Sequence, residues 1–260
     1  MSQPPANILG IDAVVQKFTA NLNEILPKFA NHIIGASKSS DRDVEHRMYE
    51  QATLASAQYA LENMVTARPF RQRKYGGGGR LDLLEHALSL VTVDGFYAEF
   101  GVFQGETLTF VANRVEKVVY GFDSFEGLPG DWFLGVTKGY FSLQGQLPKL
   151  NVTQNNFRLV KGWFNETLPD FTTQISEPAA FLHVDCDLYD STKAILDGLT
   201  ARIVPGTVIV FDEYLNYPGW QNHEHKAWKE FCEARQVKYR YVSFAPTMFS
   251  AAVVVDSVGA

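Results

Sequence analysis

The feature that most constrains the fold of this chain is a regular alternation of short apolar segments and helix-like segments, which starts at Gly95. We expect strands over 96–100, 118–123, 157–161, 180–185 and 207–212, and helices near 105–113, 191–203 and 223–235. Short apolar strands separated by helices are typical of a parallel, doubly wound α/β sheet. The last two apolar segments, 239–244 and 249–256, are joined by a link too short for a crossover, which predicts an antiparallel hairpin.

The first eighty residues follow a different pattern, and we expect them to form a helical N-terminal extension. Apolar residues recur at helical spacing between Ile11 and Phe29, and a second helical segment runs from Asp41 to Ala67. The segment Tyr75–Gly79 then ends in four glycines, which predict a flexible joint. We therefore expect an extension over 1–80, able to act as a lid, and an α/β domain over 81–260.

Composition excludes several classes of protein. A chain of 260 residues with 46% hydrophobic and 20% charged residues can bury a sizeable core, which excludes a disordered protein. The net charge of −6 argues against nucleic acid as a partner, and no apolar run reaches the roughly 18 residues of a membrane helix. Two cysteines exclude a disulfide framework. We expect a cytoplasmic protein with no membrane contact, whose apolar N-terminal helix could pair two subunits.

A first candidate site follows the first strand of the α/β domain. Gly101 and Gly105 lie between this strand and the next helix, where open α/β sheets bind ligands. Phe103 replaces a glycine of the dinucleotide fingerprint, which argues against a nicotinamide oxidoreductase. Glu99 would repel a pyrophosphate but attract the cationic S-adenosylmethionine, and Asp123 could accept its ribose hydroxyls. The structural alternative is that the glycines only shape a turn and that Asp123 caps a loop.

A second candidate site consists of acidic residues at the ends of two later strands. Asp185 and Asp212 each follow an apolar strand, and Asp187 and Glu213 come soon after them. Carboxylates this close raise one another's pKa unless a cation compensates their charge. Because all the donors are oxygens, they favour Mg²⁺ over Zn²⁺, with Ca²⁺ or Mn²⁺ as further options. The alternative is that some of these acids cap helices.

Several neighbouring polar residues have purely structural interpretations. We expect His183 to be a satisfied core residue within its strand, and Asp190 or Ser191 to cap the next helix. His223 and His225 begin a later helix but do not share one of its faces, so a zinc site there is not favoured.

Five blocks of sequence, in this order, resemble the macrocin-type O-methyltransferases, which act on deoxysugars of antibiotics and related natural products. The blocks are Glu99–Val102, Phe122–Pro129, Gly162–Pro169, Asp185–Thr192 and Phe211–Tyr214. The resemblance implies a class I methyltransferase fold, which is Rossmann-like, together with S-adenosylmethionine and a divalent ion, usually Mg²⁺. Glu213 departs from the family pattern, where a second aspartate is expected.

The resemblance also implies roles for individual residues. The metal ligands would be Asp185, Asp212 and Glu213, and Asp187 would be the general base. Trp163 either borders the adenine or is a plain core aromatic. With the strand-end residues above, the set expected to contact S-adenosylmethionine is Glu99, Gly101, Gly105, Thr107, Asp123, Ser124, Gly162, Trp163 and Asp185.

These expectations combine into an S-adenosylmethionine-dependent O-methyltransferase that acts on a hydroxylated small molecule. The methylated hydroxyl would be one of a neighbouring pair, and sugar, polyketide and aromatic diol acceptors all remain open. A metal-dependent hydrolase would use the same carboxylates without the cofactor end of the site. A non-catalytic cofactor-binding module would bind S-adenosylmethionine tightly but transfer no methyl group.

Overall fold

The computed structural model of this protein describes residues 44–71 and 79–259. The predicted apolar helix near the N-terminus and most of the predicted glycine joint lie outside the described residues. The chain divides into two compact units between Arg47 and Met48. The unit from Met48 onward carries the sheet.

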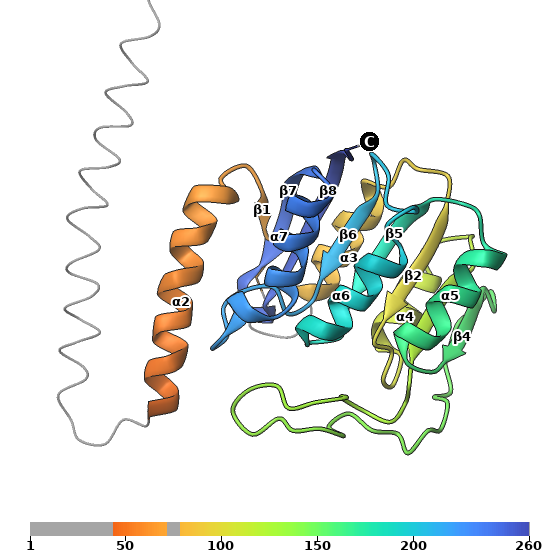
Figure 1. Cartoon of the computed structure of the whole chain (residues 1–260), viewed down its shortest axis with the longest axis horizontal. Helices are drawn as coiled ribbons and strands as arrows, with labels where there is room; N and C mark the ends of the chain where they lie inside the picture. The colour runs from red at the N-terminus through yellow and green to blue at the C-terminus, as the bar shows by residue number, and fades with distance from the viewer. Residues whose placement is uncertain (1–43, 72–78, 260) are drawn as a thin grey trace, which may run out of the picture. The chain divides into compact units, whose positions relative to one another are not determined.

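Eight strands of the described chain form one sheet in the order β1-β7-β8-β6-β5-β2-β3-β4 (Figure 1). Their bounds are β1 Arg68–Pro69, β2 Phe96–Phe100, β3 Val119–Asp123, β4 Phe157–Lys161, β5 Ala179–Val184, β6 Val208–Phe211, β7 Lys238–Ala245 and β8 Ser250–Ser257. The five expected parallel strands are confirmed, and β7 and β8 pair antiparallel as predicted. β8 also runs antiparallel to β6, so β8 alone opposes the other strands and β7 shares their direction.

Helices cover both faces of the sheet, and each face has its own apolar core. The helices are α2 Val44–Asn63, α3 Arg80–Ser89, α4 Glu106–Ala112, α5 Phe164–Gln174, α6 Tyr189–Gly198 and α7 Glu224–Ala234, with short 3₁₀ turns η1 Trp220–Asn222 and η2 Pro246–Met248. α3 and α4 lie on one face, and α5, α6 and α7 lie on the other (Figure 1). Leu83 and Leu108 anchor the first core, whereas Leu168, Ile195 and Trp228 anchor the second. None of the described helices is long and apolar enough to cross a membrane.

The start of α6 differs from expectation. Leu188 precedes the helix and no side chain caps it, so the predicted cap by Asp190 or Ser191 is wrong. Both residues already lie inside the first turn of α6, because the helix begins at Tyr189.

The fold brings the ends of β2 and β5 unusually close together. Gly101 follows β2 with φ +92°, and a Cβ atom built on it would lie 1.6 Å from the carbonyl oxygen of Asp185. Only glycine fits such an approach. Because β2 lies between β3 and β5, the strand order reverses here, at the point where open α/β sheets bind their ligands.

Candidate functional site

A cavity of about 640 Å³ opens at the carboxyl ends of the parallel strands. This volume lies within the range of small-molecule sites, roughly 300–1,000 Å³. Ten of the residues singled out from the sequence line it: Gly101, Gly105, Thr107, Asp123, Ser124, Gly162, Trp163, Asp185, Asp187 and Glu213. Glu99 and Asp212 are not among the lining residues.

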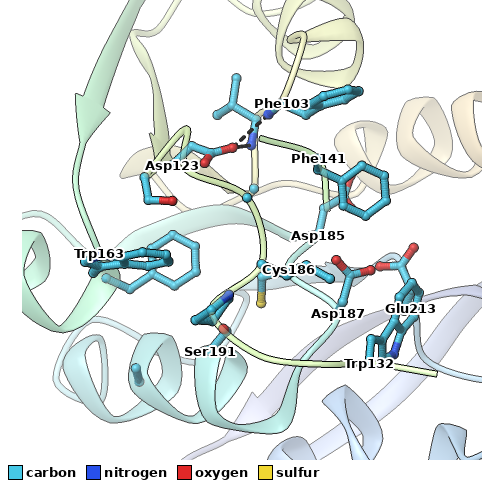
Figure 2. A pocket seen from close by; sticks show the side chains of 18 of the residues that line it. Phe103, Asp123, Trp132, Phe141, Trp163, Asp185, Cys186, Asp187, Ser191 and Glu213 are labelled. Carbon is cyan, nitrogen blue, oxygen red and sulfur yellow. Dashed lines mark hydrogen bonds between the residues drawn. The ribbon is translucent and has the colours of Figure 1, made fainter. Parts of the chain in front are cut away.

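Asp123, at the end of β3, holds the turn that follows β2. One carboxylate oxygen accepts hydrogen bonds from the amides of Val102 and Phe103, both at 2.8 Å (Figure 2). The other accepts the amide of Phe125 at 2.6 Å. Asp123 therefore closes a loop, as the structural alternative proposed, and lines the cavity as well.

Glu99 lies behind the cavity wall rather than in it. Its side chain is 1% exposed, and one oxygen accepts the hydroxyl of Thr107 at 3.1 Å. The other oxygen lies 2.9 Å from Nδ1 of His183, on the neighbouring strand. Glu99 thus lies next to Thr107, which lines the cavity, but does not line the cavity itself.

Asp212 is the centre of a buried polar network. One carboxylate oxygen accepts the hydroxyl of Ser250 at 2.8 Å, and the other accepts Nη1 of Arg80 at 2.5 Å. Nε2 of His183 lies 3.8 Å from Asp212. Burial opposes ionisation of Asp212, but His183 and Arg80 outweigh it and lower the pKa of this carboxyl. Burial also lowers the pKa of His183, yet Asp212 and Glu99 raise it overall to about 10.

Asp185 and Asp212 lie together, as their neighbouring strands predict. Ligand atoms of His183, Asp185 and Asp212 all lie within 4.8 Å of one another, and Nη1 of Arg80 is 3.6 Å from Asp185. Glu213 is outside this close group but lines the same cavity. Its Oε2 is buried and has no hydrogen-bond partner among the described residues.

Burial and repulsion by Asp212 act on the other acids of this cluster. Burial, then repulsion by Asp212, raises the pKa of Asp185 and of Glu213 well above the ordinary range. The same two causes raise the pKa of Asp187 to about 7. In Figure 2 the carboxylates of Asp187 and Glu213 lie beside each other at one end of the cavity. Concentrated oxygen donors and an unpartnered Glu213 oxygen fit a hard divalent cation such as Mg²⁺.

Asp187 has a strained backbone. Its φ is +64°, and the amide of Leu188 donates to the carbonyl of Cys186 at 2.6 Å across it, which makes a tight γ-turn. Such a conformation costs about 1–3 kcal/mol for a residue other than glycine. The chain is thus not extended after Asp185, but the turn still leaves Asp187 in the cavity wall.

Two parts of the site, Arg80 and Glu224, escaped sequence analysis. Arg80 directly follows the glycine run, and no pattern links it to acids more than a hundred positions away. Glu224 lies between His223 and His225 at the start of α7, and no sequence pattern indicated that its side chain is buried. The aromatic side chains of Trp132 and Phe141 also line the cavity.

The order of the strands, with β8 inserted antiparallel, and the cavity at the strand-order reversal define a class I methyltransferase fold. The crystal structure of CalS11, a calicheamicin methyltransferase, has this fold and superposes with a TM-score of 0.53 at 21% identity, covering 83% of this chain and 94% of that one. A sequence model of the family Macrocin-O-methyltransferase (TylF) matches residues 36–243, and the chain belongs to this family.

Characterised relatives share part of the chain. The 8-demethyl-8-(2,3-dimethoxy-alpha-L-rhamnosyl)-tetracenomycin-C 4'-O-methyltransferase of Streptomyces olivaceus is 27% identical over 159 residues, which cover 52% of this chain and 60% of the relative. The mycinamicin III 3''-O-methyltransferase of Micromonospora griseorubida is 24% identical over 164 residues, 53% of this chain and 63% of the relative. This chain thus matches less than two thirds of the length of either relative.

Proposed function

We propose that this protein is an S-adenosylmethionine-dependent O-methyltransferase that methylates a hydroxyl group of a sugar-bearing natural product. The observation that carries the proposal is one cavity with two chemically different ends. Asp123 and the turn after β2 form one end, and the acids that follow β5 and β6 form the other. Membership of the macrocin O-methyltransferase family supports the reaction type.

At the first end, the chain offers groups suited to the nucleoside of S-adenosylmethionine. Asp123 is fixed by three backbone amides, so its remaining acceptor capacity points in a defined direction. We assign the ribose hydroxyls to Asp123 and the border of the adenine to Trp163, which also lines the cavity. Glu99 would contribute only indirectly, because its carboxylate oxygens already contact Thr107 and His183 behind the cavity wall.

At the second end, Asp185, Asp212 and Glu213 would hold a divalent ion. When bound, such an ion lowers the pKa of an acceptor hydroxyl. Asp187 would accept the proton of that hydroxyl at a carboxylate oxygen, while the hydroxyl oxygen forms a bond to the methyl carbon and the methyl–sulfur bond breaks, which leaves S-adenosylhomocysteine. Asp187 lines the cavity beside these acids, which is the position that a general base for such a hydroxyl needs.

The acceptor would lie between the aromatic wall and the acids. Trp132 and Phe141 line the cavity, and aromatic faces suit the apolar faces of sugars and of aglycones. The name of the tetracenomycin relative specifies a methylated hydroxyl on a molecule that carries a rhamnosyl group. We therefore assign this chain an acceptor with two neighbouring hydroxyls, at least one of them on a sugar.

Cofactor binding and methyl transfer test the proposal directly. Calorimetric titration should show binding of S-adenosylmethionine, and a panel of glycosides with neighbouring hydroxyls should include one that is methylated with Mg²⁺ present. EDTA should abolish the transfer, and Mg²⁺ should restore it. A protein that binds no cofactor but cleaves esters or phosphates with Mg²⁺ would instead be a hydrolase, and tight binding without any transfer would indicate a binding module.

The role of Asp187 is tested by Asp187→Asn. We expect turnover to fall by at least 10²-fold, because general bases contribute about 10²–10⁴-fold. Binding of S-adenosylhomocysteine and of Mn²⁺ should change little. Asp190→Asn, in the same loop-to-helix region and also in the cavity wall, is the matched control and should retain most activity. Equal turnover in Asp187→Asn and the parent would remove Asp187 as the base.

A further inference from the structure

Glu224 connects the two loops that carry the acids of the site. It lies in the first turn of α7, and its side chain is completely buried. Oε1 accepts the amide of Cys186 at 3.3 Å, and Oε2 accepts the amide of Glu213 at 3.2 Å. Cys186 lies between Asp185 and Asp187, so one carboxylate bridges the chain after β5 and the chain after β6.

Hydrogen bonds rather than an ion pair hold Glu224 in place. Among the described residues, no lysine, arginine or histidine acts on its carboxyl group. Burial, then the neighbouring Asp187 and Asp185, raise the pKa of Glu224 well above its ordinary range. The side chain is therefore fixed by its contacts with the backbone amides of Cys186 and Glu213.

We propose that Glu224 is a positioning residue that sets the distance between the Asp185–Asp187 loop and Glu213. The inference rests on the function proposed above. Each of its two hydrogen bonds from backbone amides fixes a peptide plane directly beside an acid of the site, and rotation of that plane would swing the adjacent side chain. Groups that orient metal ligands in this way typically change metal affinity by 10–100-fold when they are replaced.

Glu224→Gln tests this role with a minimal change in shape. The amide keeps one acceptor oxygen and replaces the other with an NH₂ group that cannot accept, so one of the two loops loses its partner. We expect Mn²⁺ affinity, measured by electron paramagnetic resonance, to fall by 10–100-fold. Affinity for S-adenosylhomocysteine and the unfolding temperature without metal should stay close to those of the parent. Turnover should fall with little change in the KM for S-adenosylmethionine.

The matched control is Glu233→Gln, an exposed carboxylate on the same helix, which should behave as the parent. A measurement on the unmodified protein complements the variant: amide hydrogen exchange at Cys186 and Glu213 should be slow, and it should accelerate in Glu224→Gln. Fast exchange of both amides in the parent would show that the bridge does not form, and would overturn the proposal even if the variant failed to fold.

The outcomes separate this inference from the proposed function. Unchanged Mn²⁺ affinity and turnover in Glu224→Gln would overturn the role of Glu224 alone. Parallel loss of unfolding temperature and of S-adenosylhomocysteine binding would make Glu224 a structural residue, and would overturn the role as well. A parent protein that binds neither Mn²⁺ nor S-adenosylhomocysteine would contradict the proposed function itself.

Discussion

At the scale of single residues, the site depends on how the charge of Asp212 is balanced. Asp212 is 2% exposed, and Arg80 is the cation hydrogen-bonded to it. The same guanidinium lies 3.6 Å from Asp185. Under the proposed function, a divalent ion would share the charge-balancing position that Arg80 occupies, and it would compete with the guanidinium for the same carboxylate oxygens.

This competition makes Arg80→Gln informative. Without metal, the variant leaves the buried carboxylate of Asp212 without its guanidinium partner, and we expect its unfolding free energy to fall by about 1–3 kcal/mol. This loss is smaller than that for breaking a fully buried ion pair, because Arg80 is partly exposed. Mg²⁺ should stabilise the variant more than the parent, because the ion no longer displaces a guanidinium. Urea unfolding in EDTA and in Mg²⁺ measures both effects.

The control for this variant is Arg114→Gln. Arg114 lies 3.6 Å from Glu85, and both side chains of this ion pair are more exposed than those of Arg80 and Asp212. This change should shift unfolding by less than about 0.5 kcal/mol, in EDTA and in Mg²⁺ alike. Equal stability of Arg80→Gln and the parent in EDTA would show that Asp212 does not depend on the guanidinium.

At the scale of elements, tertiary contacts decide more than local pattern. α5 was not predicted, because its segment contains Pro169, a residue that usually interrupts helices. The helix forms because Leu168 and Phe171 bury against the sheet, where the ring of Phe171 meets those of Phe96 and Phe122. The burial of one helix face thus outweighs the loss of a single backbone hydrogen bond.

The start of α7 carries a second element-scale feature, a histidine enclosed by aromatic rings. The ring of His225 lies 4.9 Å from that of Tyr59, 5.0 Å from that of Tyr214 and 4.7 Å from that of Trp220. These contacts join α2, the loop after β6 and η1 to α7. Burial, with a smaller contribution from Lys229, lowers the pKa of His225 to about 4.

The lowered pKa of His225 predicts a loss of stability in acid. The unfolded chain takes up a proton at His225 near pH 6.5, whereas the native state does so only near pH 4. The unfolded state therefore binds more protons between these values, and the unfolding free energy falls as pH drops from 6.5 toward 4. We expect His225 to account for about 1–3 kcal/mol of this loss, since it is not fully buried.

Urea unfolding of the parent and of His225→Phe at pH 7.5 and pH 4.5 measures this contribution. The phenylalanine keeps the ring contacts but cannot take up a proton, so the variant should lose less stability between the two pH values than the parent. Identical losses would show that His225 does not titrate with the lowered pKa.

At the scale of the whole molecule, ligand binding should stabilise the native state from both ends of the cavity. A ligand at a hundred times its dissociation constant adds about 2.7 kcal/mol, which for a chain of this size raises the unfolding temperature by roughly 5–10 °C. S-adenosylhomocysteine should produce such a shift in the parent. Asp123→Ala should lose most of that shift but keep the one produced by Mg²⁺, and calorimetry measures both. An equal shift with S-adenosylhomocysteine in the variant would remove Asp123 from cofactor binding.

Much of the architecture is encoded locally in this sequence. The alternation of apolar segments predicts the core strands to within two residues at each end, because strand and helix periods are properties of short segments. Asp185 and Asp212 stand at strand ends, so a parallel sheet brings them to one edge wherever their strands are neighbours. Membership of the family follows from the same ordered blocks.

What only the tertiary structure decides is which side chains reach the cavity and which partners they find there. Glu99 is withdrawn behind the wall toward Thr107, while Arg80 reaches Asp212 across 132 positions of sequence. β7 runs parallel to the main sheet because β8 inserts between it and β6. These outcomes depend on sheet twist, strand register and the packing of distant helices, which together set the position of a side chain to within a few ångströms. A sequence pattern specifies only the face of the helix or strand on which the side chain lies.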